Sequence, residues 1–387
     1  MNSLSAENIE VFATDGNCVS PLGCNLESNM DRLLKGDIAI KKLNDKQFDD
    51  NSFYGAIIND SELNTSFSQL NYQGEFSKLE KMLLLALSPI VEKHHSRLNK
   101  KCGFILSSTK GNIDQINTDI QAYFLHNLAN NISKAIDLEE KPIVLSNACV
   151  SGVMAVSVAK RLIQTGVYDH VVLVAGDIFS TFVYSGFQSF QAISPEPCRP
   201  YSKHRDGISL GEAAAAMFIT KEKSIADNSG FKISGDSSIN DANHISGPSR
   251  TGEGLFRSVE NALNDSNIKS NDIDCISSHG TATPFNDEME AQAFSRANLT
   301  KTPVFSLKGC FGHTLGAAGL LETVITLDAA QNGVLLPSYG FDEMGITIPL
   351  NITREIQKQS INTVLKTASG FGGSNTAVIF EKIKSNG

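Results

Sequence analysis

The sequence has no lysine- or arginine-rich run, no closely spaced cysteine pair and no apolar run long enough to span a membrane. Because the formal net charge is also −9, nucleic acid is not an expected partner. Residues 1–10 are polar and lack the apolar core of a signal peptide. These absences exclude the nucleic-acid-binding and membrane-spanning classes as first interpretations.

The cysteines are odd in number and scattered, with no CxxC spacing: Cys18, Cys24, Cys102, Cys149, Cys198, Cys275 and Cys310. This pattern is typical of a reducing compartment and argues against both a disulfide framework and a zinc site. We therefore expect a cytoplasmic protein without a bound metal.

The chain is long enough for two ordinary domains or one large duplicated fold. It has 387 residues, of which 41% are hydrophobic and 19% charged, as in ordinary globular proteins. Apolar runs alternate with segments of helical periodicity, which predicts an α/β protein with a mostly parallel sheet.

The expected strands lie near residues 9–14, 103–106, 143–145, 171–176, 231–234, 273–277, 304–306, 363–367 and 376–380. The expected helices lie near residues 26–35, 78–92, 118–136, 153–163, 255–263 and 315–330. Asp15-Gly16-Asn17 should end the first strand, and the polar residues 41–78 should form a surface excursion. After a polar segment at 221–230 the order of elements recurs. We therefore predict two α/β halves, residues 1–225 and 226–387.

Cys149 is the first candidate for chemistry. The apolar run 143–145 leads into it, and a helical pattern over 153–163 follows it. Cys149 should therefore lie on a tight turn at a helix N-terminus, where the helix dipole favours the thiolate form. A thiolate is a strong nucleophile, and the small neighbours Ser151 and Gly152 leave room for a substrate. A buried structural cysteine is the alternative.

Three further stretches carry polar groups where a fold alone would not need them. Residues 278–284 follow a strand end, which is where ligands bind in open α/β sheets. Residues 308–313 open a Gly/Ala-rich helix, His313 to Glu322, that allows close packing and has a positive end. Residues 369–375 are too glycine-rich for a strand and should form a turn that exposes backbone N–H donors.

Together these stretches resemble the β-ketoacyl-acyl carrier protein synthase family, in the branch with a Cys-His-His site. The matching motifs are Val19-Ser20-Pro21-Leu22-Gly23, Ala148-Cys149-Val150-Ser151-Gly152, Arg199-Pro200-Tyr201-Ser202-Lys203-His204-Arg205-Asp206-Gly207, Gly211-Glu212-Ala213, His279-Gly280-Thr281-Ala282-Thr283, Lys308 with Gly312-His313, and Gly370-Phe371-Gly372-Gly373. The resemblance implies a thiolase-like fold of two pseudo-duplicated α/β halves in αβαβα layers.

The resemblance also implies a reaction, the decarboxylative Claisen condensation of an acyl chain with malonyl-acyl carrier protein. Cys149 would take the acyl group, with the backbone N–H groups of Cys149 and Phe371 holding the oxyanion. Neutral His279 and His313 would donate hydrogen bonds to the malonyl thioester oxygen as decarboxylation turns it into an enolate. The product would be a 3-oxoacyl chain two carbons longer, made by an acyltransferase.

Supporting roles follow from the same resemblance. Lys308 would orient the histidines, and Glu322 would pair with it, although the sequence leaves an exposed Glu322 equally open. Thr281 and Thr283 match positions that contact the pantetheine arm, and Phe371 would also gate the pocket. The implied partners are an acyl carrier protein, which brings the phosphopantetheine, and a second ketosynthase-like subunit in a homodimer or heterodimer. No cofactor of the enzyme's own is implied.

Two departures concern chain length and pathway. The segment between Gly103 and Cys149 is shorter than in the family's fatty-acid elongation enzymes, and Lys110 falls where those enzymes carry small or apolar pocket residues. Fatty-acid, aryl-polyene and polyketide elongation all remain open. A catalytically weak chain-length subunit of the same fold is the alternative function. A thiolase would need a further cysteine near the C-terminus, and none follows Cys310.

Overall fold

The computed structural model describes residues 9–46, 48–49, 52–227, 230–241 and 247–383. These residues form an 11-stranded sheet and two small sheets. In spatial order the large sheet contains β13 (Asn351–Ile352), β11 (Pro303–Phe305), β10 (Cys275–Ser277), β15 (Thr363–Gly370), β16 (Ser374–Lys382), β9 (Phe231–Asn240), β1 (Phe12–Val19), β8 (Ala213–Thr220), β6 (His170–Asp177), β4 (Cys102–Ser107) and β5 (Ile143–Leu145). The small sheets are β12 (Val334–Leu335) with β14 (Gln357–Lys358), and β2 (Lys41–Leu43) with β3 (Phe53–Ala56) and β7 (Leu210–Gly211).

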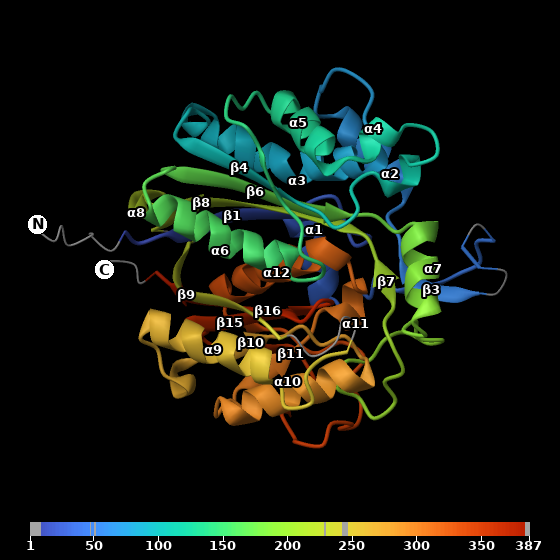
Figure 1. The fold of residues 1–387 in the computed structure, drawn as a ribbon, viewed down its shortest axis with the longest axis vertical. Coiled ribbons are helices and arrows are strands. Elements are labelled where there is room, and N and C mark those ends of the chain that lie inside the picture. Colours follow the sequence, from blue (N-terminus) through green and yellow to red (C-terminus); the bar gives the residue numbers. More distant parts are fainter. Residues whose placement is uncertain (1–8, 47, 50–51, 228–229, 242–246, 384–387) are drawn as a thin grey trace, which may run out of the picture.

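Helices lie on the outer side of each half of this sheet, and two more helices lie between the halves (Figure 1). The two halves of the sheet lie on either side of a middle layer made by α6 (Ser151–Gln164) and α12 (Ala318–Gln331). The outer layers contain α3 (Lys78–His94) and α5 (Leu125–Ala135) on one side, and α9 (Glu253–Ser266) and α10 (Pro284–Arg296) on the other. This is the αβαβα arrangement that the family resemblance implied.

The two halves repeat one order of elements. In the first half β1, α3, β4, α5, β5, α6, β6 and β8 follow one another, and in the second half β9, α9, β10, α10, β11, α12, β15 and β16 do so. The halves meet where β1 pairs with β9. The duplication places α6 and α12 in equivalent positions, so their N-termini can build one site together. The division into domains at residue 225 stays a prediction.

The sheet is mixed, so the prediction of a mostly parallel sheet was wrong. Its outer pairs are parallel, such as β4 with β5 and β10 with β11, whereas the central pairs from β6 to β15 are antiparallel. A tight turn joins β15 to β16, and strands joined in this way must run antiparallel. The first strand also does not end at Asp15. It continues to Val19 through an irregularity between Thr14 and Asn17, which absorbs the positive φ of 46° at Asp15.

Three other predictions need correction. The polar residues 41–78 are not a plain excursion, because they include β2, β3 and the helix α2 (Asp60–Ser68). The helix expected over 118–136 is divided into α4 (Ile120–Tyr123) and α5, since Phe124 between them is extended. The run 143–145 is a half-buried edge strand rather than a buried one. The remaining described helices are α1 (Leu26–Leu34), α7 (Thr181–Ser189), α8 (Lys223–Ala226) and α11 (Lys308–Phe311).

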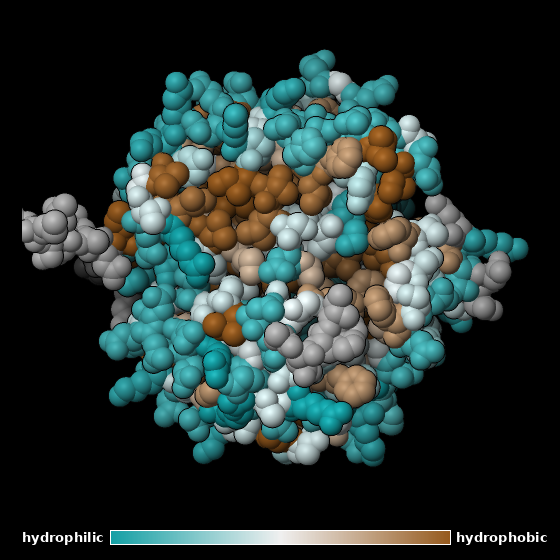
Figure 2. Space-filling model, in the orientation of Figure 1, coloured by the Kyte–Doolittle hydropathy of each residue, from teal (hydrophilic) through white to brown (hydrophobic). Residues whose placement is uncertain are grey.

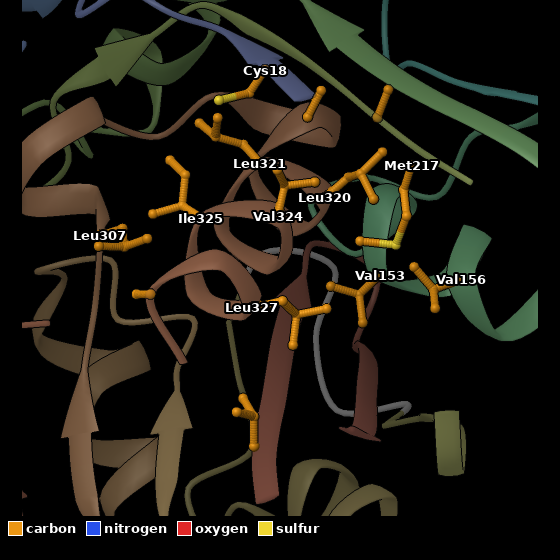
Figure 3. Packing of buried hydrophobic residues seen from close by; sticks show 14 of the residues in the cluster. Cys18, Val153, Val156, Met217, Leu307, Leu320, Leu321, Val324, Ile325 and Leu327 are labelled. Atoms are coloured by element: carbon orange, nitrogen blue, oxygen red, sulfur yellow. The ribbon is translucent and has the colours of Figure 1, made fainter. Parts of the chain in front are cut away.

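The middle layer depends on glycines, as the Gly/Ala-rich sequence suggested. A Cβ at Gly152 of α6 would lie 2.7 Å from the backbone nitrogen of Leu320, and one at Gly319 of α12 would lie 2.5 Å from Val153. Figure 3 shows α12 side chains clustered with Val153 and with Met217 of β8.

Among the described residues, no helix is long and apolar enough to cross a membrane. The apolar surface of α12 is instead buried in protein.

We predict that Gly152→Ala destabilises the protein by about 2 kcal/mol, because the new methyl group overlaps the backbone of α12. Gly186→Ala is the matched control, since it lies in α7 and its added Cβ meets nothing within 4 Å. The control should be neutral or slightly stabilising, because alanine favours helix over glycine. Urea unfolding measures both. Equal stability of the two variants would contradict the close packing of α6 on α12.

Candidate active site

Cys149 occupies the turn between β5 and α6, as predicted. The turn is tight because Ala148 has a left-handed φ of 44° and the Val150 N–H donates to the Asn147 carbonyl at 3.2 Å. The end of β15 passes directly beside it, since a Cβ at Gly370 would lie 3.2 Å from the Cys149 nitrogen. Any larger residue at position 370 would crowd this approach. The approach brings the 371–373 turn to the thiol.

His279 follows the end of β10, also as predicted. The Glu290 carboxylate of α10 accepts the backbone N–H groups of His279 at 2.8 Å and Gly280 at 2.7 Å. Asp287 of the same helix accepts the N–H of Thr281 at 3.1 Å. Two buried carboxylates therefore fix the loop that carries the imidazole ring.

His313 lies just outside the helix in which it was predicted. The chain forms the short α11, turns at Gly312 with a φ of 69°, and reaches α12 only at Ala318. The His313 backbone N–H donates to the Ser209 carbonyl at 2.7 Å. Its ring Nδ1 accepts the Leu315 N–H at 3.1 Å. This hydrogen bond leaves the proton of the neutral ring on Nε2.

The structure brings the three predicted reactive residues together. One sulfur or nitrogen atom from each of Cys149, His279 and His313 lies within 4.8 Å of the other two, and all three residues are buried. The two imidazole rings are nearly perpendicular, at 84°, with centroids 5.4 Å apart. The three residues face a cavity of about 510 Å³. Thr281 and Thr283 line the same cavity, with their hydroxyl oxygens 2.8 Å apart.

Lys308 and Glu322 form the predicted ion pair beneath this group. The Lys308 Nζ lies 2.6 Å from the Glu322 carboxylate and donates to the His279 carbonyl at 2.7 Å. Glu322 is 3% exposed, so the alternative of an exposed helix residue was wrong. A second cation, Lys366 of β15, lies 2.5 Å from the other Glu322 oxygen.

Phe371 begins the turn between β15 and β16. The turn spans only residues 371–373, because residues 369–370 and 374–375 of the predicted loop belong to the two strands. The Phe371 backbone N–H lies where it favours the charged form of the Cys149 sulfur, which lowers the pKa of that thiol. Its ring is 37% exposed and packs against Phe187, at 5.8 Å between centroids, and Phe190, at 5.6 Å. This position suits both an N–H donor and a gate at the cavity.

Cys149 is a thiol at neutral pH, which corrects the expectation that its helix position favours a thiolate. Burial raises the pKa of Cys149 to about 11, although attraction to Lys308 and the hydrogen bond from the Phe371 N–H oppose the rise. Desolvation of a charged sulfur outweighs the favourable effects of Lys308 and the Phe371 N–H here. The resting nucleophile therefore needs a proton acceptor close by.

Both histidines are neutral, and because the Leu315 N–H keeps the proton of His313 on Nε2, His279 is the one that can take that part. Burial and the charge of Lys308 hold the pKa values of His279 and His313 well below the ordinary value of 6.5. The same trio could in principle hold a metal ion. Metal binding would need a thiolate and a bare Nε2 on His313, whereas burial favours the thiol and Leu315 keeps the proton on Nε2. The donor set thus favours hydrogen-bond chemistry.

Two buried residues of the site were not found in the sequence. Lys366 lies in a run of strand residues, where a lysine commonly faces solvent. Asp177, at the end of β6, accepts N–H groups from Thr109 at 3.0 Å and Gly316 at 2.8 Å. It thereby ties the loop after β4 to the segment after His313. In the sequence, the only feature near Asp177 is the hydrophobic run that precedes it. That run predicts a strand but no role for the aspartate.

Comparison with known proteins identifies the family to which this fold belongs. Residues 99–224 match the N-terminal domain of beta-ketoacyl synthase, and residues 231–342 match its C-terminal domain. The chain belongs to the beta-ketoacyl synthase family of the thiolase superfamily. The two matched domains include Cys149, both histidines, Lys308 and Glu322.

Similar proteins include two bacterial synthases. The chain is 31% identical to 3-oxoacyl-[acyl-carrier-protein] synthase 2 of Coxiella burnetii over 65% of its length and 64% of that protein. It is 27% identical to the Vibrio harveyi protein of that name over 96% of its length and 98% of that protein. Its fold is similar to the ketosynthase ApeO solved with its chain length factor ApeC from Xenorhabdus doucetiae, with a TM-score of 0.83, 23% identity and coverage of 99% and 100%.

We predict that alkylation of Cys149 accelerates about tenfold per pH unit between pH 7 and 9, because the thiolate fraction grows by that factor below a pKa of about 11. Iodoacetamide labelling at several pH values, with peptide mass spectrometry at Cys149, measures the rate. The partly exposed Cys24 is the internal reference. An alkylation rate at Cys149 that does not change with pH above pH 7 would show that Cys149 is already a thiolate, as the sequence predicted.

Proposed function

We propose that this chain is an acyltransferase that condenses an acyl group, held on Cys149, with malonyl-acyl carrier protein. The reaction releases carbon dioxide and gives a 3-oxoacyl-acyl carrier protein two carbons longer. The observation that carries the proposal is the buried trio of one thiol and two neutral imidazoles within 4.8 Å. A nucleophile and two N–H donors are what an acyl transfer followed by an enolate attack requires.

In the first step, Cys149 attacks the thioester of an acyl carrier protein. Its proton passes to the His279 imidazole as the carbon–sulfur bond forms, and the departing carrier thiolate takes that proton in return. The N–H groups of Cys149 and Phe371 are the proposed donors to the oxyanion of this step, since the Phe371 N–H already stabilises negative charge on the sulfur.

In the second step, malonyl-acyl carrier protein loses carbon dioxide, and the electron pair of the broken bond forms an enolate. His313 donates from Nε2 to the enolate oxygen, because Leu315 holds its Nδ1 as an acceptor. His279 is the second donor. Two neutral donors stabilise a charge that exists only in the transition state and intermediate. The enolate carbon then attacks the acyl group on Cys149, and the thiolate leaves.

The partner substrate is an acyl carrier protein with its phosphopantetheine arm. Thr281 and Thr283 line the cavity and are the proposed contacts of that arm. Side chains and backbone N–H groups supply every group in the two steps, so the proposed reaction uses no cofactor of the enzyme's own. All seven cysteines are free thiols, which is the state kept by the reducing cytoplasm that we propose as its location.

A second ketosynthase-like subunit is the other proposed partner. β5 is an edge strand of the large sheet, with half-buried apolar side chains. Beside it α6 carries three more, Met154, Val158 and Leu162. Figure 2 shows a broad hydrophobic area over the place that α6 occupies in Figure 1. An edge strand next to an apolar face favours pairing with another chain of the same fold, either a copy or a chain-length subunit.

The alternative function, a chain-length subunit with little activity, has less support. Such a subunit has no use for a reactive cysteine beside two imidazoles. Here Cys149, His279 and His313 are all present, and their reactive atoms lie within 4.8 Å of one another. The pathway, whether fatty-acid, aryl-polyene or polyketide elongation, depends on the acyl group that Cys149 accepts.

Cys149→Ala should abolish the covalent acyl adduct, because alanine has no nucleophile. Intact-mass measurement after incubation with acyl carrier proteins of graded chain length tests this. The wild type should gain the mass of one acyl group over a limited range of chain lengths. Cys24→Ala is the control and should load normally. An adduct that persists in Cys149→Ala would overturn the assignment of the nucleophile.

His313→Ala should spare acyl loading within a few fold and slow malonyl decarboxylation by about 100-fold or more, because it removes one donor to the enolate. Single-turnover acylation and carbon dioxide release are measured separately. His204→Ala changes an exposed histidine and should affect neither step. Equal loss of both steps in His313→Ala would show that the residue acts through structure.

A further inference from the structure

Lys366 is a fully buried cation in the site that no role above explains. It lies in β15 and is 1% exposed. Its Nζ donates to the carbonyl oxygens of Ser277 at 3.2 Å and Ser278 at 3.3 Å, and to Glu322 at 2.5 Å. Three acceptors use all three N–H groups of an ammonium, whereas a neutral amine has only two. Lys366 is therefore charged.

Lys366 and Lys308 both pair with the Glu322 carboxylate, and both donate hydrogen bonds to backbone carbonyls at the end of β10. Each lysine takes one oxygen of Glu322. Together they also hold three successive carbonyls, those of Ser277 and Ser278 by Lys366 and that of His279 by Lys308. Two ammonium groups and one carboxylate sum to +2 − 1 = +1, so this triad keeps a net positive charge directly beneath His279.

The charged and titratable groups around His279 come from several elements: Lys308 of α11, His313, Lys366 of β15, Glu290 of α10, Glu322 of α12 and Cys149. Burial is the largest cause of the lowered pKa of His279, and the charges of Lys308, His313 and Lys366 act in the same direction. A single Lys308–Glu322 pair would be neutral. The second lysine is what makes the net charge positive.

We propose that Lys366 is a positioning residue of the condensation site, which fixes the strand end that carries His279 and keeps its ring a neutral N–H donor. The inference rests on the proposed function, because a neutral donor at His279 matters for an enolate.

Three variants separate charge from structure. Lys366→Met changes the net charge of the triad from +1 to 0, so the pKa of His279 should rise by about one pH unit. Glu322→Gln changes it to +2, so that pKa should fall. The double variant Lys366→Met/Glu322→Gln returns the triad to +1, so the pKa of His279 should return close to that of the wild type although both side chains are altered.

The readout is nuclear magnetic resonance titration of ring-labelled histidine, with His279→Gln to assign the signal among the 8 histidines of the chain. This measurement needs no substrate and is independent of the proposed function. Lys160→Met is the matched control, because Lys160 is 5% exposed and pairs with Asp236 at 3.0 Å and Asp265 at 2.7 Å outside the site. It should lower stability without moving the His279 titration. An unchanged titration in Lys366→Met would overturn the proposal.

The same variants are then assayed for decarboxylation of malonyl-acyl carrier protein against pH. The rate falls at low pH as His279 gains a proton, and in Lys366→Met this fall should begin about one pH unit higher. A wild type that never decarboxylates the substrate would refute the proposed function, while the titration would still test Lys366. A wild type that does so, with the same acidic limb in Lys366→Met, would refute only the role of Lys366.

Should Lys366→Met alone not fold, the comparison of Glu322→Gln with the double variant gives the same information. These two proteins differ only at residue 366. The pKa of His279 should be higher in the double variant, by about one pH unit. Equal values in these two proteins would overturn the proposal as well.

Discussion

The contact between α6 and α12 is the constraint on which the rest of the molecule depends. Gly152 allows the backbones of the two helices to touch, and this is possible only because no side chain separates them. Cys149 lies at the N-terminal end of α6, and His313 lies shortly before α12. A wider separation of the helices would move the thiol and the imidazole apart. The duplicated fold therefore supplies two equivalent helix ends, and a glycine brings them within reach.

Burial sets the chemistry of the groups collected there. It raises the pKa of Cys149 and lowers the pKa values of His279 and His313, so all three resting groups are neutral. The charged groups lie next to these residues, in the triad of Lys308, Lys366 and Glu322. Neutral groups can exchange a proton and donate hydrogen bonds without the cost of desolvating an ion. The triad fixes the position of the neutral groups and biases their protonation.

The reactive residues could be predicted from the sequence because each lies in a short motif with glycines at an element end. Cys149, His279 and His313 were found in this way, whereas the pairing of Lys308 with Glu322 was implied only by the family resemblance. Lys366 could not be found, because its carboxylate partner is 44 residues away and its strand gives no sign of burial. The thiolate was wrongly expected for the same reason, since a helix N-terminus is visible in sequence but desolvation is not. The mixed sheet was missed because strand direction depends on pairing between distant segments.

The central claim is that one active site couples loss of carbon dioxide to formation of a carbon–carbon bond. The direct test supplies an accepted acyl carrier protein together with malonyl-acyl carrier protein labelled at its free carboxyl carbon. Released label and the mass of the carrier-bound product are then measured in one reaction. The account predicts one labelled carbon dioxide for each 3-oxoacyl product, which is two carbons longer than the primer and unlabelled. A product that retains the labelled carbon, or acyl loading that is never followed by elongation, would contradict it.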